Sequence, residues 1–302
     1  MRYRLLASIS IVSILAFSLT LFAAPAPPQP AQKKILIGLI PEMNIFKQKQ
    51  RFKLLGEYLS RKTGVPVEFT ILSRYGNIID SFSKEHMDAA FFGSFTGALA
   101  IQKLGVVPLA RPVNLDGSST YHGFLFVRRD SGIRTVKDMK GKKMAFVDKA
   151  TTAGYLFPLA WLREQGITNS KGFFSETFFT GSHDAAIRSL LDKKADIGAA
   201  KHSVYDRVRK EEPRVDEELV ILAESPKVPS NGLCVRKDLP ADLQKELKDA
   251  LLNLHRDPEA ADALKSFGAL KFIETTARDY APVFDMARKA GIDVKTYNYK
   301  NE

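Results

Sequence analysis

The amino-acid sequence predicts an α/β protein with two lobes, each a mixed sheet flanked by helices. Short apolar runs alternate with amphipathic helical patterns, and the whole alternation occurs twice along the chain. Of the 302 residues, 45% are hydrophobic and 26% are charged, which is enough apolar material for one large domain or two lobes. Two extended segments lie outside the repeats, and we expect them to cross between the lobes as a hinge.

The N-terminus predicts export from the cytoplasm. Arg2 and Arg4 precede an apolar run that ends at Ala24, and a spacer rich in Pro and Ala occupies residues 25–33. A basic start followed by an apolar run is typical of a signal peptide. The run is long for that purpose, and about 20 apolar residues can span a bilayer. Residues 1–24 are therefore expected to be a signal peptide or an uncleaved anchor in the inner membrane.

The first repeat of the α/β pattern follows the spacer. An amphipathic helix is predicted to end at Gly64, since glycine is common just past a helix end. A second helix follows the next apolar run. The predicted strands are 33–41, 65–72 and 88–94, and the predicted helices are 46–64 and 76–87.

The second repeat has the same order of elements. Its predicted strands are 142–148, 173–181 and 195–201, and its predicted helices are 153–166 and 183–194. Extended apolar runs at 119–133 and 218–240 supply the two crossings. We assign residues 34–127 and 231–302 to the first lobe and residues 128–230 to the second. The helical C-terminal remainder is expected to pack on the first lobe.

Small and polar residues follow the predicted strands of both lobes. In open α/β sheets, ligands bind beyond the carboxyl ends of the strands, where helix N-termini present N–H groups. These ends are 40–44, 73–76 and 92–97 in the first lobe, and 148–154, 180–184 and 199–203 in the second. Two facing polar rims joined by two crossings predict a hinged cleft that closes on a small molecule.

The segment "DKATTAG" at 148–154 predicts an anion site. Thr151 and Thr152 offer hydroxyls, and the backbone N–H groups of Ala153 and Gly154 lie in the first turn of a helix, where the dipole favours negative charge. A threonine is also an ordinary helix cap that needs no ligand, so this alternative stays open. The spacing of a nucleotide phosphate loop and its lysine are missing.

His183 begins the next helix of the second lobe, after the capping residue Ser182. Its imidazole could donate a hydrogen bond to an anion, or it could cap its own helix. The other histidines lack the spacing of a metal site, and no nucleophile motif is present. We therefore expect a binding protein rather than an enzyme, with no metal and no cofactor.

The composition disfavours nucleic acid as a partner. The formal net charge is +11, but Lys and Arg alternate with Asp and Glu along most of the predicted helices. Cys234 is the single cysteine, so an intramolecular disulfide is impossible and the apolar core must stabilise the fold.

Several of these motifs occur in an order that resembles a known family. The run "YHGFLFVRRDSGIRTVKDMKGKKMAFVDKATTAGYLFPLAWLREQGI", followed by "FFTGSHDAAIRSLLDKKADIGAA", resembles the periplasmic phosphonate, phosphite and phosphate-binding proteins of ABC transporters. That family shows D-S-x-I, D-L-x-G-K, S-T-S-G-x-x-x-P and G-x-H-x-x-A in this order. The likeness covers residues from about 35 to about 245, and it implies a type II periplasmic-binding-protein fold.

The resemblance also implies a set of ligand-binding residues. Thr151 and Thr152 stand where the family's Ser-Thr pair binds the oxyanion, and the remaining donors come from both lobes. The set that we carry over is Tyr75, Ser94, Tyr121, Thr151, Thr152, Ala153, His183 and Asn231.

The chain departs from the family's pattern at several of these positions. Ala153 replaces the second serine of S-T-S-G, and Gly97 stands where a tyrosine is often found, which predicts a roomier wall. Ser203 and Asn231 align with acidic residues that bind the ligand amine in aminoalkylphosphonate binders. Without those carboxylates a buried ammonium would have no counter-charge, so 2-aminoethylphosphonate is not expected to be the best ligand.

The resemblance implies a monomeric, exported solute-binding protein that delivers phosphate, phosphite or a small alkylphosphonate to a permease. Two alternatives remain open: a membrane-tethered sensor that reports its ligand to a signalling partner, and the same fold binding a different small anion. A periplasmic hydrolase of phosphate esters is a further, less favoured class.

Overall fold

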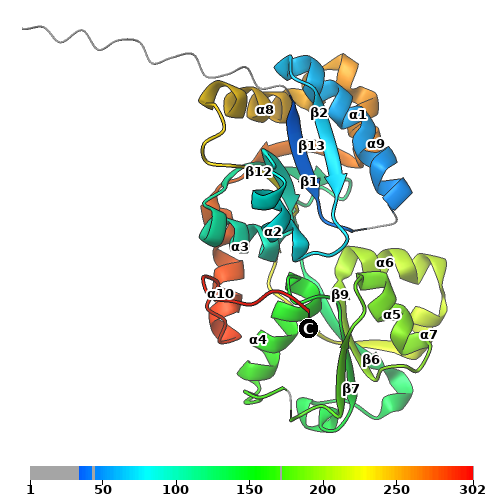
Figure 1. Cartoon of the computed structure of the whole chain (residues 1–302). Coiled ribbons are helices and arrows are strands. Elements are labelled where there is room, and N and C mark those ends of the chain that lie inside the picture. Colours follow the sequence, from blue (N-terminus) through cyan, green and yellow to red (C-terminus); the bar gives the residue numbers. More distant parts are fainter. Residues whose placement is uncertain (1–33, 43–44, 171, 302) are drawn as a thin grey trace, which may run out of the picture. The chain divides into compact units, whose positions relative to one another are not determined.

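The computed structural model describes residues 34–42, 45–170 and 172–301 (Figure 1). The predicted signal peptide or anchor at 1–24 and the spacer at 25–33 lie outside the described residues. Among the residues that are described, no helix is both long and apolar enough to cross a membrane.

The elements are used below with the following bounds. The strands are β1 Ile35–Leu39, β2 Val67–Ile71, β3 Ala89–Phe92, β4 Val107–Asn114, β5 Thr120–Tyr121, β6 Gly123–Arg128, β7 Lys143–Phe146, β8 Glu176–Phe179, β9 Ile197–Lys201, β10 Leu219–Glu224, β11 Val228–Pro229, β12 Gly232–Val235 and β13 Ala269–Glu274. The helices are α1 Ile45–Thr63, α2 Asn77–Lys84, α3 Ser94–Leu104, α4 Phe157–Glu164, α5 His183–Leu191, α6 His202–Glu211, α7 Arg214–Glu218, α8 Ala241–Asn253, α9 Ala261–Phe267 and α10 Ala281–Lys289.

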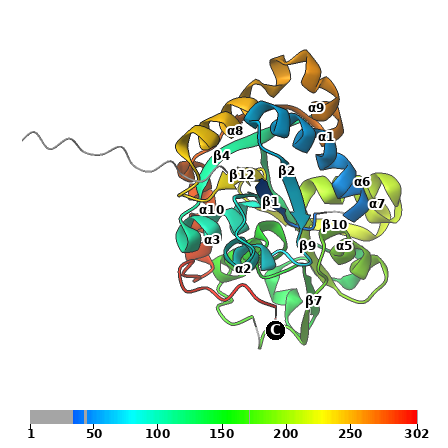
Figure 2. The same ribbon diagram turned by 45° about the horizontal axis from the view of Figure 1, so that its top comes forward.

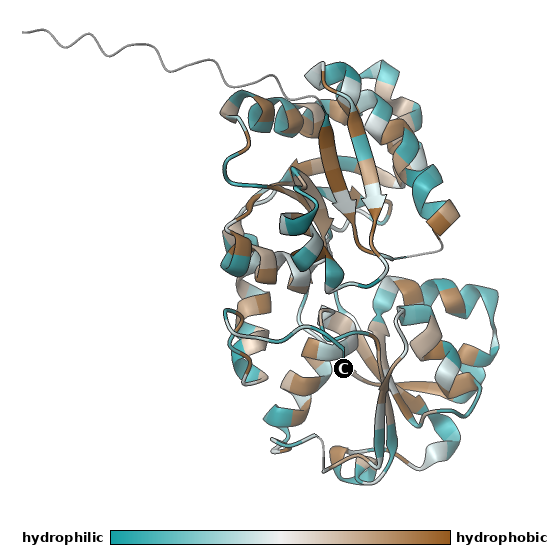
Figure 3. Cartoon of the chain, in the orientation of Figure 1, coloured by the Kyte–Doolittle hydropathy of each residue, from teal (hydrophilic) through white to brown (hydrophobic). Residues whose placement is uncertain are grey.

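Lobe one is built on a mixed sheet with the strand order β13-β4-β12-β3-β1-β2. Strand β1 pairs in parallel with β2 and β3, whereas β12 runs antiparallel to both β3 and β4. Alternate residues of β1 point to opposite faces, as the two-residue period of a strand requires. Ile35 and Ile37 pack under α1, α8 and α9, and Gly38 faces Ile78 of α2. Both faces are therefore covered by helices, and β1 is strongly apolar (Figures 2 and 3).

Lobe two is built on a second mixed sheet, with the order β10-β6-β9-β7-β8. Helices α5, α6 and α7 cover one face, where Phe126 packs with Ile187 and Leu190. The other face is covered by α4 and by the turn that precedes it, where Phe146 and Leu156 are buried. The two predicted α/β repeats thus form two separate sheets, as expected from the sequence.

The chain crosses between the lobes at β5 and β11, which pair with each other as a short antiparallel ribbon. One boundary differs from the sequence-based assignment, which left residues up to 127 in the first lobe. Strand β6 pairs with β9 and β10 and so belongs to the sheet of lobe two. The sequence of an apolar run does not reveal which sheet the strand joins, because a strand that is buried on both faces has the same apolar pattern in either sheet.

The C-terminal segment contacts both lobes, rather than only the first as expected. Helices α8 and α9 pack on lobe one, but α10 lies against both α3 and α4. Beyond α10, the Tyr299 hydroxyl donates to Asp80 of α2 at 2.7 Å, and the Tyr297 hydroxyl donates to the Lys149 carbonyl of lobe two at 3.0 Å. The Asn301 side-chain amide donates to Asp148 at 3.0 Å.

Gly97 does not make the wall of the site roomier. It lies in α3 against the ring of Tyr280, and a Cβ at position 97 would be 2.5 Å from Tyr280 Cε1. Tyr280 is fully buried and its hydroxyl lies 3.8 Å from the Cys234 sulfur. The volume that a side chain would fill at position 97 is taken by an aromatic ring from the C-terminal part of the chain.

We expect Gly97→Ala to destabilise the protein, because the added methyl group overlaps a buried ring that cannot move without disturbing the core. The free energy of unfolding in urea should fall by about 1–3 kcal/mol. Gly172→Ala is the control, since its Cβ would meet nothing closer than 4.0 Å. Equal stability of the two variants would contradict this account of the Gly97 contact.

Candidate ligand-binding site

A small cavity lies between the lobes at the carboxyl ends of their strands. Its volume is about 20 Å³, which is close to the space of one water molecule. The lining residues come from both lobes and are mostly polar: Ile40, Glu42, Tyr75, Gly93, Ser94, Phe95, Thr96, Tyr121, Ala150, Thr151, Thr152, His183, Lys201 and Asn231. The tetrahedral oxyanion that the resemblance implies is larger than one water, so it would fit here only if the lobes separated slightly.

Three hydroxyl groups meet at the centre of this cavity. Ser94 Oγ, at the start of α3, lies 2.6 Å from Tyr121 Oη and 2.6 Å from Thr152 Oγ1. Ser94 belongs to lobe one, Thr152 to lobe two and Tyr121 to the crossing strand β5. Three hydroxyls carry three protons but form two hydrogen bonds here, so one O–H remains to donate to a ligand.

The two threonines have different roles in this geometry. The Thr151 hydroxyl donates to the carbonyl of Asp148 at 2.6 Å, so its proton is used inside the turn. Thr152 instead reaches across the cleft to Ser94. Thr152 also begins a π-helical turn, Thr152–Leu156, that continues directly into α4. The first N–H groups of such a helix have no acceptor within it, and they favour an anion at this end.

Tyr75 contributes a hydroxyl that has no hydrogen-bond partner. The residue is only 4% exposed, its Oη is fully buried, and the structure gives it no donor or acceptor within reach. Its ring packs edge-on against His183, with the ring centroids 6.1 Å apart. Leaving a buried polar group unpaired costs about 1–3 kcal/mol. A ligand oxygen in the cavity would supply the missing acceptor.

His183 is held neutral and oriented as a donor. Burial, together with the positive charge of Lys201, lowers the pKa of His183 to about 3. Its Nδ1 accepts the backbone N–H of Lys201 at 3.2 Å, so the proton of the neutral ring is on Nε2. The imidazole therefore remains a neutral N–H donor across the physiological range.

An ion pair joins the two lobes at the edge of the cavity. Lys201 Nζ of lobe two lies 3.2 Å from Glu42 Oε1 of lobe one and 4.6 Å from the centre of the Tyr121 ring. Burial raises the pKa of Glu42, but the positive charges of Lys201 and Arg51 outweigh it, so this pKa lies below its usual value. Glu42 is thus ionised and already paired.

Seven of the eight sequence-predicted residues line this one cavity: Tyr75, Ser94, Tyr121, Thr151, Thr152, His183 and Asn231. Ala153 is not among the lining residues. Its Cβ faces Gly123 of β6, where a Cβ at position 123 would be only 2.8 Å away. The sequence analysis did not single out Glu42 or Lys201, although each lies in a strand-end segment that it named.

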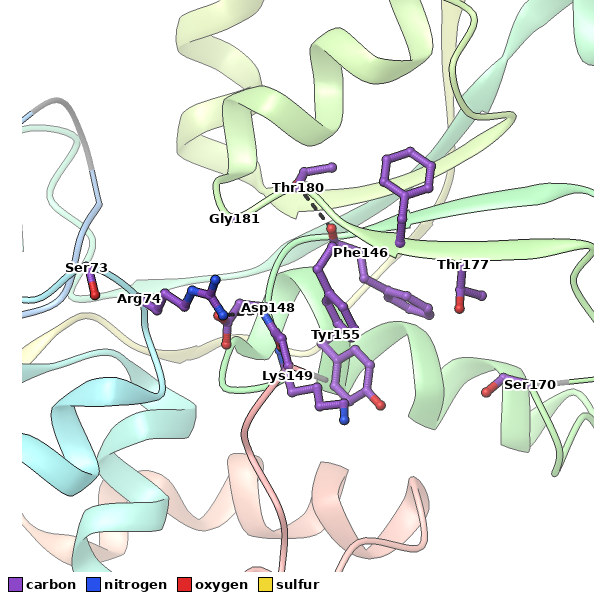
Figure 4. Close-up of a pocket in the computed structure, with 13 residues that line it drawn as sticks. Ser73, Arg74, Phe146, Asp148, Lys149, Tyr155, Ser170, Thr177, Thr180 and Gly181 are labelled. Carbon is purple, nitrogen blue, oxygen red and sulfur yellow. Dashed lines mark hydrogen bonds between the residues drawn. The ribbon is translucent and has the colours of Figure 1, made fainter.

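A larger cavity of about 790 Å³ lies on the other side of Asp148 (Figure 4). None of the seven residues lines it, and its walls come mainly from β7, β8 and the ring of Tyr155. Arg74 points towards Asp148, which is 3% exposed, and burial raises the pKa of that carboxyl.

Within the part of the chain that the structure describes, no group of three His, Cys, Asp or Glu residues could hold a metal ion.

The unpaired Tyr75 hydroxyl predicts how substitution changes the free energy of unfolding of the ligand-free protein. Tyr75→Phe should not lower the free energy of unfolding, since the lost group has no partner to lose. Tyr121→Phe is the matched substitution, and it should cost about 1 kcal/mol because it removes the bond to Ser94. Urea unfolding of both variants measures the difference, and a larger loss for Tyr75→Phe would contradict the geometry.

The low pKa of His183 predicts an acid-sensitive stability. An unfolded histidine takes up a proton near pH 6.5, whereas His183 in the folded state does so only near pH 3. Between these values the unfolded state binds more protons, so this contribution to stability is lost as the pH falls. The fall should be up to about 1.4 kcal/mol per pH unit, and His183→Gln should abolish it. Urea unfolding from pH 7 to pH 4 tests this, with the exposed His255→Gln as control. If the free energy of unfolding falls with pH equally in wild type and His183→Gln, this account of His183 is wrong.

Comparisons with known proteins identify the family of this chain. The family model described as "ABC transporter, phosphonate, periplasmic substrate-binding protein" matches residues 37–280. The phosphonates-binding periplasmic protein of Escherichia coli (strain K12) is 22% identical over 291 residues, covering 95% of this chain and 85% of that protein. A probable ABC transporter phosphite binding protein, PhnD1 of Prochlorococcus marinus (strain MIT 9301), is 26% identical over 285 residues, covering 91% and 96%.

Solved structures show the same fold. A binding-protein component of an ABC phosphonate transporter from Pseudomonas aeruginosa has a TM-score of 0.76 at 21% identity, covering 86% of this chain and 87% of that chain. PhnD1 from Prochlorococcus marinus, solved in complex with methylphosphonate, has a TM-score of 0.73 at 24% identity, covering 86% and 98%. The family match spans most of the chain, and the fold is that of the type II periplasmic binding proteins. This chain belongs to the family of periplasmic phosphonate-binding proteins of ABC transporters.

Proposed function

We propose that this protein is exported, closes on a phosphorus oxyanion and delivers it to an ABC transporter permease. The observation that carries the proposal is the set of donors around the cavity between the lobes. These are the Ser94, Thr152 and Tyr121 hydroxyls, the unpaired Tyr75 hydroxyl and the neutral His183 imidazole. An array of hydrogen-bond donors at a helix N-terminus favours an anion rich in oxygen.

The chemistry of the cavity supports phosphate, phosphite or a small alkylphosphonate as the ligand. The carboxylate that lines it, Glu42, is neutralised by Lys201 across the cleft. An ammonium-bearing ligand would have to compete with Lys201 for this carboxylate. We therefore retain the expectation that 2-aminoethylphosphonate is not the preferred ligand, and the relatives named for phosphite and methylphosphonate support this class.

Closure is part of the proposed mechanism. An oxyanion would insert between Ser94 and Thr152, and each hydroxyl would then donate to ligand oxygen instead of sharing a proton with the other. The Lys201–Glu42 ion pair would then form again and hold the two lobes closed over the bound oxyanion. Export would be directed by residues 1–24, whether they are removed or retained as an anchor.

A thermal-shift panel over phosphate, phosphite, sulfate, methylphosphonate and 2-aminoethylphosphonate tests the ligand class. A ligand that binds only the folded state raises the melting temperature in a concentration-dependent way. We expect phosphorus oxyanions to do so, with 2-aminoethylphosphonate weaker than methylphosphonate. If no phosphorus oxyanion raises the midpoint, the proposed ligand class is wrong.

In the same experiment, Thr152→Val should weaken the binding of the best ligand by about 1–3 kcal/mol, because valine keeps the shape but loses the hydroxyl. The exposed Thr177→Val in β8 is the control and should bind like wild type. Equal affinity of the two variants would remove Thr152 from the site.

A further inference from the structure

A second cavity, of about 140 Å³, opens directly beside the cavity at the threonines. The two cavities share Ile40, Glu42, Lys201 and Asn231 as lining residues. The second cavity is several times the size of the first, and it has room for a short arm attached to a bound oxyanion. It extends under α1 towards Gln48, Arg51 and Phe267.

Arg51 gives this second cavity a net positive charge, because Glu42 is the carboxylate among its lining residues and it faces both Lys201 and Arg51. Lys201 and Glu42 neutralise each other at 3.2 Å, whereas Arg51 forms no ion pair with any residue that the structure describes. Its Nε donates to the Phe267 carbonyl at 2.7 Å, and its guanidinium lies 4.5 Å from the centre of the Phe267 ring. These contacts fix the guanidinium plane and leave its terminal N–H groups to bind an acceptor. The fork geometry of arginine suits a carboxylate.

Gln48 adds a buried acceptor to the same wall. The residue is 3% exposed and lies one helical turn before Arg51 on α1. Its Nε2 donates to the Ile40 carbonyl at 2.7 Å, which fixes the orientation of the amide. Its Oε1 is buried and has no hydrogen-bond partner. This atom requires an N–H or O–H donor, so the wall offers one cation and one acceptor side by side.

We propose that the preferred ligand is a short phosphonate with a carboxylate on its far end, bound by Arg51, and with an amino or hydroxyl group beside it, bound by Gln48. The inference rests on the proposed function, since the phosphonate end occupies the site of Thr152 and His183. In this proposal, the residues of α1 in lobe one select the group that is attached to the phosphonate. A bare phosphate or phosphite would leave Gln48 Oε1 without a donor and the terminal N–H groups of Arg51 without a ligand acceptor, and an unpaired buried acceptor is unfavourable.

Calorimetry with methylphosphonate, 3-phosphonopropionate, 2-amino-3-phosphonopropionate and 2-aminoethylphosphonate tests this inference. Wild type should bind both carboxylates at least about tenfold more tightly than methylphosphonate, and the amino acid most tightly. Arg51→Gln should abolish the preference for carboxylates, measured as the ratio of their affinity to that for methylphosphonate, and Arg51→Lys should restore part of it. Gln48→Met should remove only the advantage of the amino acid.

Lys47→Gln is the matched control. Lys47 is an exposed cation on the same helix that does not line the second cavity, so its substitution removes the same charge at a different place. It should keep the preference for carboxylates. If wild type binds methylphosphonate as tightly as 3-phosphonopropionate, or if Lys47→Gln lowers the preference as much as Arg51→Gln, the inference is wrong. If phosphate or phosphite binds but none of the phosphonates does, the inference is wrong and the proposed function stands. If no phosphorus oxyanion binds at all, the proposed function itself fails, and the two failures are thereby distinguished.

Discussion

The contact between Ser94 and Thr152 is the interaction on which the site depends, because it is made by hydroxyls from opposite lobes. Each hydroxyl begins a helix that packs on its own sheet, so the distance between them reports how far the lobes are closed. Tyr121, on the crossing strand, bonds to the same Ser94 oxygen and ties the hinge to the cleft. A ligand that replaces this contact therefore acts on both lobes and on the hinge together.

The charges around the cleft fit the proposed anionic ligand, although the positive charge of the protein is mostly scattered. Glu42 and Lys201 come from different lobes and pair only when the lobes are close. This pair removes the carboxylate from competition with an anionic ligand, while the buried neutral His183 donates a hydrogen bond without adding charge. Selection then rests on donors and acceptors whose positions are fixed by the surrounding backbone, and unpaired buried groups penalise a wrong ligand.

The C-terminal part of the chain supports this arrangement from outside the cleft. Tyr280 fills the space beside Gly97 on α3, and the residues after α10 bond to lobe one through Asp80 and to lobe two through Asp148 and Lys149. Asp148 also accepts hydrogen bonds from the turn that carries the threonines. The last residues of the chain thus contact the loop that presents Thr152.

The sequence by itself determined the two α/β repeats and named seven of the residues that line the cavity between the lobes. Local patterns carry this information: apolar runs and helical periods mark the elements, and the residues that end each strand must gather at one edge of the sheet. The resemblance to a family added Tyr75, Ser94, Tyr121 and Asn231. Only the tertiary structure placed β6 in lobe two, packed Tyr280 against Gly97 and brought Lys201 to Glu42. Each of these depends on a contact between segments far apart in the chain, and such contacts leave no periodic signal in either segment.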